Sequence, residues 1–310
     1  MNRLTSMSAL ILWGCLTPVA CAVAPPITSI AFTPDRKAVV TTSQSGVAVH
    51  SWPALKRQRV IKATASNLHC LCFSPDGKHL AIGGGDPASE GIVEVFSWPE
   101  AKSVALLKEH EDSVRSIVWQ SNSRLLSASL DRQIKLWELT KKASLRSFQG
   151  HSRGVSALAL LRDGKTLVST GDDVSVRVWT VTSGKLVRSL SQHSMPIHAV
   201  ALRPGNEGLP LIATASADKT IRFWQPTIGR MARFARLKVE PLSIAWLKDG
   251  ERIVASCVDG CVRVVDATEV TVTKTLSVFK GWAYAIAVHP TDGSLVVGGS
   301  NGRVRRVILD

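Results

Sequence analysis

The chain has 310 residues, a formal net charge of +14 and a hydrophobic content of 45%. The hydrophobic content is ample for a buried core and excludes a chain too polar to fold. The charge favours anionic partners such as nucleic acid, acidic proteins or membrane surfaces, although a basic surface also serves solubility alone. This length would ordinarily suggest two domains, but an internal repeat predicts one closed body instead.

The first 22 residues differ from the rest and are predicted to be a secretory signal peptide. Arg3 is their only charge, a short apolar run covers residues 8–16, and Ala20-Cys21-Ala22 fits an A-x-A cleavage site. The run is too short to span a bilayer. Two alternatives stay open: an ordinary disordered or strand-forming terminus, and lipoprotein-type processing before Cys15, which closes a sequence resembling a bacterial lipobox. We therefore expect a periplasmic or extracellular protein, or else a membrane-anchored lipoprotein.

The four cysteines beyond the leader are predicted to be small buried hydrophobic residues. Cys70 and Cys72 lie two apart on one strand face, too far apart for an easy disulfide. Cys257 and Cys261 flank a turn and would oppose each other only if its loop has three residues. No CxxC spacing supports zinc, so we expect neither a metal nor a cofactor.

From residue 27 onward the chain repeats one unit, seen most clearly between His110 and His151. Its apolar residues alternate with polar ones in short runs separated by polar turns, which predicts half-buried antiparallel strands. The last strong apolar residue of each first strand recurs every 41 to 46 residues, at Phe32, Phe73, Trp119, Leu160, Leu202, Trp246 and Val288. Seven such units predict an all-β fold over residues 23–310, a seven-bladed β-propeller of four-stranded antiparallel blades.

The residues that flank these strands resemble those of the WD40-repeat family. Third strands end in tryptophan at Trp52, Trp98, Trp137, Trp179 and Trp224. Gly150-His151 precedes a first strand, His110 and His193 hold the same position, and Trp137-Glu138 approaches the family's Trp-Asp. The motifs are degenerate, since four units lack the histidine and Val265-Asp266 lacks the tryptophan. From Ile27 onward, the chain is therefore identified as similar to WD40 propellers, as a secreted member of bacterial type.

The seventh unit ends after residues 303–309 without a fourth strand. A three-stranded final blade would leave an exposed sheet edge. In the proteins that this chain resembles, the missing strand usually comes from the N-terminus, which implies pairing of residues 16–22 with the last blade. Cleavage after Ala22 would remove that strand, whereas processing before Cys15 would keep it.

Three units combine a hydroxyl residue with His, Asp and Trp, which superficially suggests a hydrolase triad. The sets are His110, Ser127, Asp131 and Trp137; His151, Ser169, Asp173 and Trp179; and His193, Thr214, Asp218 and Trp224. Catalytic sites are not normally triplicated at the period of a repeat, whereas structural networks are. The family resemblance implies that each set forms a buried hydrogen-bond network, so no catalytic residue is assigned.

The first strands are expected to line the central channel, and their predicted ranges contain no Asp or Glu, which argues against a metal-dependent propeller hydrolase. Their second residues are mostly polar: Thr28, His69, Arg115, Ser156, His198, Leu242 and Tyr284. By analogy with WD40 proteins these lie near the channel mouth. Adjacent turns add Arg132, Lys219 and Arg303, and Trp282 joins Tyr284 as an aromatic anchor, so this ring is the candidate partner-binding site. The alternative is that a channel mouth is polar simply because water reaches it.

The predicted outer strands form a second basic feature. Residues 56–63, 102–108, 141–147, 185–191, 230–238 and 274–280 together carry 17 basic residues and no acidic one. Lys or Arg on a sheet edge opposes aggregation, which explains part of this charge. Attraction to a polyanion or an anionic surface is the alternative.

The sequence thus favours a non-catalytic, extracytoplasmic propeller that binds another protein or peptide at its channel mouth. The alternative is a binder of an anionic polymer or a membrane surface through the basic rim, and a propeller enzyme is less favoured. We expect no specific nucleic acid and no small-molecule substrate. Because His69 and His198 lie in the proposed ring, affinity for an anionic partner should rise as pH falls from about 7.5 to 5.5.

Overall fold

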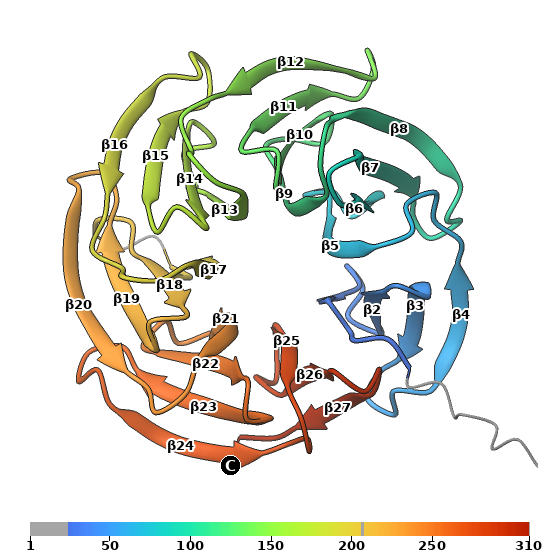
Figure 1. The fold of residues 1–310 in the computed structure, drawn as a ribbon. Coiled ribbons are helices and arrows are strands. Elements are labelled where there is room, and N and C mark those ends of the chain that lie inside the picture. The colour runs from blue at the N-terminus through green and yellow to red at the C-terminus, as the bar shows by residue number, and fades with distance from the viewer. Residues whose placement is uncertain (1–23, 206–207, 310) are drawn as a thin grey trace, which may run out of the picture.

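The computed structural model describes residues 24–205 and 208–309, all of them in strands, turns and loops. Its strands form seven antiparallel sheets around a central channel, as Figure 1 shows. Blades one to three contain β1 (Ser29–Phe32), β2 (Ala38–Ser43), β3 (Gly46–Ser51), β4 (Arg57–Ile61), β5 (Leu68–Phe73), β6 (His79–Asp86), β7 (Glu90–Ser97), β8 (Ser103–His110), β9 (Val114–Trp119), β10 (Arg124–Ser129), β11 (Ile134–Glu138) and β12 (Ala143–Phe148). Blades four to seven contain β13 (Val155–Leu160), β14 (Thr166–Gly171), β15 (Val176–Thr180), β16 (Leu186–Leu190), β17 (Ile197–Leu202), β18 (Ile212–Ser216), β19 (Thr220–Gln225), β20 (Arg230–Arg236), β21 (Pro241–Trp246), β22 (Arg252–Cys257), β23 (Cys261–Asp266), β24 (Val272–Ser277), β25 (Ala283–Val288), β26 (Leu295–Gly299) and β27 (Val304–Val307).

Each blade runs in chain order from the channel to the rim, and the seventh has three strands among the described residues. The predicted all-β, seven-bladed propeller is therefore confirmed, including the shorter last blade. Tight hairpins join the strands because glycine or a polar residue adopts positive φ in the turns, as Gly164 and Arg132 do.

The hydrophobic core lies between neighbouring blades. Phe223 of blade five packs with Trp246 of blade six, their ring centroids 5.7 Å apart, in one buried cluster. Trp246 also donates its indole N–H to the carbonyl of Ala201 at 3.1 Å. Trp119 does the same to Cys72 at 3.0 Å, so these two indoles tie blade six to blade five and blade three to blade two.

Blades seven and one close the ring through the segment before β1. The backbone N–H of Ile27 donates to the carbonyl of Gly299 at 3.1 Å. Its buried side chain fills the space beside Gly298, where an added Cβ would lie 2.5 Å from Ile27. The predicted leader and the strand expected at residues 16–22 lie outside the described residues.

All four cysteines of the described part are free thiols. Ser256 pairs with Val262, so Cys257 and Cys261 flank a three-residue loop, yet no disulfide joins them. Cys70 and Cys257 are buried and the other two are half-buried. Burial raises the pKa of Cys72 and of Cys257 to about 11, which keeps both thiols protonated and unreactive.

The fourth strand of each of the first six blades contains a β-bulge near its start. A bulge inserts one unpaired residue into the fourth strand. The residue that follows it pairs directly with a residue of the third strand, and the two side chains therefore lie on the same face of the sheet. These post-bulge residues are Arg59, Ala105, Arg146, Arg188, Arg233 and Lys274.

Candidate binding site at the channel mouth

The second residues of all seven predicted first strands line one cavity of about 360 Å³. Its walls are formed by Pro26, Thr28, Gln44, Leu68, His69, Arg115, Ser156, His198, Ala199, Leu242, Ser243 and Tyr284. Strands from every blade converge at this end of the channel, which explains why residues so far apart in sequence meet. The volume lies within the range of small ligand or side-chain pockets.

Two hydroxyls of the ring are already engaged in holding blades together. Thr28 donates to the carbonyl of Leu68 at 2.7 Å, and Ser156 donates to that of Ile197 at 2.6 Å. Both bonds join an inner strand to the next blade. These two residues therefore line the cavity but leave little hydrogen-bonding capacity for a partner.

Arg115 provides the cavity with N–H donors that have no partner among the described residues, and His69 provides a neutral imidazole. Arg115 makes no hydrogen bond or ion pair with any residue of the described part, and its side chain is exposed. Burial, aided by the charge of Arg115, lowers the pKa of His69 to about 4. The expected rise of affinity between pH 7.5 and 5.5 is therefore wrong for His69, because its ring stays neutral throughout that range.

His198 has a partner that the sequence prediction missed. Its Nε2 atom lies 2.6 Å from a carboxylate oxygen of Glu240, the residue directly before β21. The inner strands contain no acidic residue, but an acidic residue beside them contacts His198 of the cavity wall. Glu240 lies one residue before the predicted strand 241–246, so a search for acidic residues within that strand misses it.

The other ring candidates lie outside the cavity wall. Trp282 is 47% exposed and packs against Tyr284, their centroids 5.5 Å apart, so it extends the aromatic surface beyond the cavity. Arg132, Lys219 and Arg303 are exposed on the turns between second and third strands and do not line the cavity. The structure thus brings together six of the ten predicted binding residues.

The three repeated sets of His, hydroxyl, Asp and Trp lie at blade ends and form closed hydrogen-bond chains. His151 Nδ1 lies 3.0 Å from Asp173, its Nε2 lies 2.7 Å from Ser169 Oγ, and Trp179 donates to that same Oγ at 2.8 Å. His110 is joined in the same way to Ser127, Asp131 and Trp137, as is His193 to Thr214, Asp218 and Trp224. The hydroxyl oxygen of Ser169 accepts a hydrogen bond from the buried indole of Trp179 and contacts the buried imidazole of His151, so a substrate could not reach it.

The carboxylates of these sets stay ionised. Burial alone would raise the pKa of Asp131, but hydrogen bonds and the charge of His110, with backbone N–H donors, lower it overall. Burial would raise the pKa values of Asp173 and Asp218 too, but hydrogen bonds from His151 and Ser175 lower that of Asp173, and hydrogen bonds from Thr220 and His193 lower that of Asp218. Burial lowers the pKa of His193, although the hydrogen bond and the charge of Asp218 act in the opposite direction.

Part of the basic rim has a structural role. Arg59 donates to the carbonyl of Pro99 at 2.6 Å, Arg146 to that of Ser183 at 2.9 Å, and Arg188 to that of Thr227 at 3.4 Å. Each acceptor belongs to the turn before the outer strand of the next blade. These post-bulge arginines brace adjacent blades, a role that the sequence prediction did not include.

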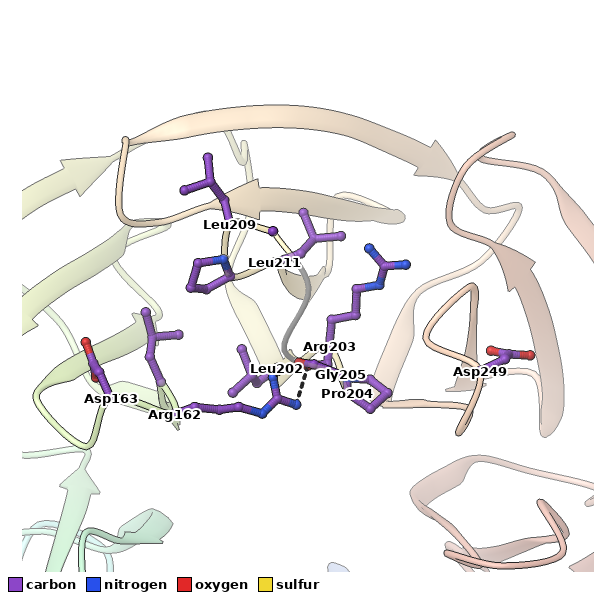
Figure 2. A pocket seen from close by; sticks show the side chains of 12 residues that line it. Arg162, Asp163, Leu202, Arg203, Pro204, Gly205, Leu209, Leu211 and Asp249 are labelled. Atoms are coloured by element: carbon purple, nitrogen blue, oxygen red, sulfur yellow. Dashed lines mark hydrogen bonds between the residues drawn. The ribbon is translucent and has the colours of Figure 1, made fainter.

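A larger cavity of about 660 Å³ opens at the opposite ends of blades four to six. Figure 2 shows Arg162 reaching from its own turn to the neighbouring turn, where it donates to the carbonyls of Arg203 and Gly205. Arg203 in turn donates to the carbonyl of Gly250 at 2.5 Å. The wall also includes Leu209, which is 48% exposed.

Residues 24–205 and 208–309 contain no metal-binding cluster and no membrane-spanning helix. No three His, Cys, Asp or Glu side chains there are grouped to hold a metal ion. In the same ranges no helix has the length and apolar character needed to cross a membrane.

Comparison with known families gives one match that covers more than half of the chain. The model described as "WD domain, G-beta repeat" matches residues 55–87, 101–138, 142–180, 184–225 and 239–266. Four of the five stretches begin at or near the fourth strand of one blade and end near the second or third strand of the next, whereas the fifth covers the first three strands of blade six. The sequence repeat is thus offset from the blade.

Several curated proteins are similar to part of this chain. UBP9-binding protein bun62 of Schizosaccharomyces pombe is 31% identical over 41% of this chain and 24% of its own length. Periodic tryptophan protein 2 homolog of Dictyostelium discoideum is 27% identical over 65% of this chain and 22% of its own. Protein FIZZY-RELATED 1 of Arabidopsis thaliana is 26% identical over 74% and 48%, respectively. In each case the match spans less than half of the relative.

Proposed function

Because the chain belongs to the WD domain, G-beta repeat family, we propose that it is a non-catalytic module that binds a protein or peptide at the channel mouth. One observation carries this proposal: all seven blades contribute residues to one cavity, where Arg115 has no hydrogen-bond or ion-pair partner among the described residues. Because the side chain is exposed, its N–H donors are accessible to an acceptor on a bound partner.

The chemistry of the cavity fits an extended segment with an acceptor at its centre. Arg115 offers up to five N–H donors to a carboxylate or to backbone carbonyls. Tyr284 and exposed Trp282 provide an adjoining aromatic surface. Arg, Tyr and Trp dominate the binding energy of protein interfaces. We therefore place Arg115 at the centre of the interface and Trp282 at its edge.

The printed name of one relative supports a protein partner. UBP9-binding protein bun62 is named for binding another protein. Transferred to this chain, that name suggests only the class of partner. It suggests no particular partner and no cellular setting.

Quantitative affinity capture tests this function. Wild type, Arg115→Gln and Arg153→Gln would be used as bait at low and high salt, since Arg153 is exposed, has no described partner and lies outside the cavity. The proposal expects captured proteins to be lost with Arg115→Gln and kept with Arg153→Gln. Equal capture by all three baits would contradict it.

The salt series also tests a second candidate, binding of an anionic polymer or a membrane surface through the basic rim. The 17 basic residues of the outer segments favour this second candidate. Three of them, Arg59, Arg146 and Arg188, already donate hydrogen bonds to neighbouring blades. Rim binding would fall steeply with salt, because it is driven by counterion release, and would not depend on Arg115.

We also propose export, on the leader-like composition of residues 1–22, with a mature start at Val23 or, for a lipoprotein, at Cys15. A reporter fused after residue 30 would be exported if the leader is functional. Intact mass of the exported protein distinguishes the two starts, and a reporter that stays inside the cell would contradict both.

A further inference from the structure

The post-bulge arginine of blade five breaks the pattern of the other braces. Arg59, Arg146 and Arg188 each donate to a carbonyl of the next blade. Arg233 holds the same register position, opposite Phe223, yet it makes no such bond. Its Nε atom is buried without a hydrogen-bond partner in the described structure. The guanidinium that would brace blade six is left available.

A bulge brings a second arginine to the same face. Arg230 pairs with Gln225 and Arg233 with Phe223, while Ala232 is the extra residue. Because Gln225 and Phe223 lie two apart on β19, their partners share a face, which strict alternation along β20 would not allow. Without the bulge, Arg233 would lie on the opposite face from Arg230.

Arg203 completes a basic cavity of about 360 Å³ between these residues. Its wall consists of Arg203, Gly208, Leu209, Leu211, Gln225, Arg230, Ala232 and Arg233. Arg203 is held by its Nε–H bond to Gly250, which leaves its two terminal nitrogens for other acceptors. Three guanidinium groups line a single pocket, at the end of blade five opposite the channel mouth.

Among the described residues, the carboxylate of Asp266 lies near enough to Arg233 for their charges to interact. Backbone N–H bonds from Glu269 and Thr268 lower the pKa of Asp266, and the charges of Arg233 and Arg252 lower it further. Asp266 is thus committed to its own turn and does not line the cavity. The described part of the cavity wall therefore carries three guanidinium groups and no carboxylate, which favours a strongly anionic group such as a phosphate of about −1.5 to −2 charge.

We propose that this cavity binds a phosphoryl group on a side chain of a partner protein. Planar guanidinium groups donate pairs of N–H bonds to phosphate oxygens, and three of them can surround one tetrahedral group. Gln225 adds an amide donor, and half-exposed Leu209 offers an apolar contact for residues beside the phosphorylated one. A pocket of this size suits one phosphorylated side chain rather than an extended polyanion. The site lies away from Arg115 and stands independently of the channel-mouth function.

Titration of the full chain with short peptides tests the proposal. The probes are an N-acetylated Ala-Leu-phosphoserine-Leu-Ala amide, the same peptide with serine or glutamate, inorganic phosphate, and a single-stranded RNA. Binding is measured at an ionic strength of about 0.15 M, where non-specific attraction is largely screened. The variants are Arg233→Gln, Arg230→Gln and Asp266→Asn. Arg236→Gln is the matched control, since it makes the same charge change at the other end of β20 without lining the cavity.

The phosphopeptide should bind at least about tenfold more tightly than the other probes. Arg233→Gln or Arg230→Gln should weaken it about tenfold, Arg236→Gln by less than about twofold, and Asp266→Asn should strengthen it by removing a competing charge. Arg115→Gln should change nothing, which separates this site from the channel mouth. Melting temperatures of the variants report on folding.

Three results would overturn the proposal. Equal affinity for phosphorylated and unphosphorylated peptides would rule out a phosphoryl site. Equal affinity for inorganic phosphate and phosphopeptide would rule out a protein source. Tighter binding of the RNA, lost in the same two arginine variants, would assign the cavity to nucleic acid instead.

Discussion

Arg115 and His69 line the same cavity, and burial together with the charge of Arg115 holds the pKa of His69 at about 4. The imidazole is thus neutral in the folded protein but titrates near pH 6.5 once unfolded. Between these values the unfolded chain binds the extra proton. The stability contributed by neutral His69 is therefore present above pH 6.5 and declines as pH falls towards 4.

His69→Gln should accordingly flatten the dependence of stability on pH. We expect wild type to lose stability between about pH 7 and 4.5, with a smaller loss in the variant. His50 and His193, whose pKa values burial also lowers, contribute to the loss that remains in the variant. Urea unfolding at a series of pH values measures the two slopes. Identical slopes would show that His69 is not desolvated.

The buried network of blade four should be worth a measurable part of the stability. His151→Ala leaves Ser169 and Asp173 without their ring partner, so we expect a loss of about 1–3 kcal/mol in the free energy of unfolding. Chemical denaturation measures it, with the exposed neighbour change Ser152→Ala as control. An unchanged midpoint in His151→Ala would remove the network's structural role.

The braces of the rim provide a comparison between equivalent positions. Arg146→Gln removes a 2.9 Å bond to the next blade and should cost about 0.5–1.5 kcal/mol. Arg233→Gln removes no such bond and should leave stability nearly unchanged. Thermal unfolding of both variants checks this. Equal losses would mean that Arg233 braces blade six after all.

Ring closure depends on the contact between Ile27 and Gly298. Gly298→Ala should destabilise the protein by about 1–3 kcal/mol, because the new Cβ would collide with Ile27. Ile27→Ala should cost about 2–5 kcal/mol, as it empties a buried site. The double variant should cost less than the two losses added, since truncation makes room for the new methyl group. Strict additivity would contradict direct packing.

Hydrogen exchange tests the strand predicted at residues 16–22. If those residues complete blade seven, the amides of residues 304–307 should be protected in full-length protein and exchange faster in protein that starts at Val23. Strong protection in the shorter form would show that closure does not need this strand.

The repeat period was sufficient to predict the blades, and the second position of each first strand was sufficient to locate the cavity. Alternation and turn residues are local properties, and the ring brings equivalent positions together. The period could not show that the hydroxyls of Thr28 and Ser156 donate hydrogen bonds to carbonyls of the next blade. It also could not place Arg233 beside Arg230, because a bulge changes the register without leaving a mark in the alternation pattern.

Peptide display followed by variant titration tests the channel-mouth function most directly. Peptides would be selected on wild-type protein alone, and each would then be titrated against Arg115→Gln and Arg153→Gln. We predict that most selected peptides lose about tenfold or more in affinity with Arg115→Gln and less than about twofold with Arg153→Gln. Selected peptides that bind Arg115→Gln as tightly as wild type would contradict a partner site at the channel mouth.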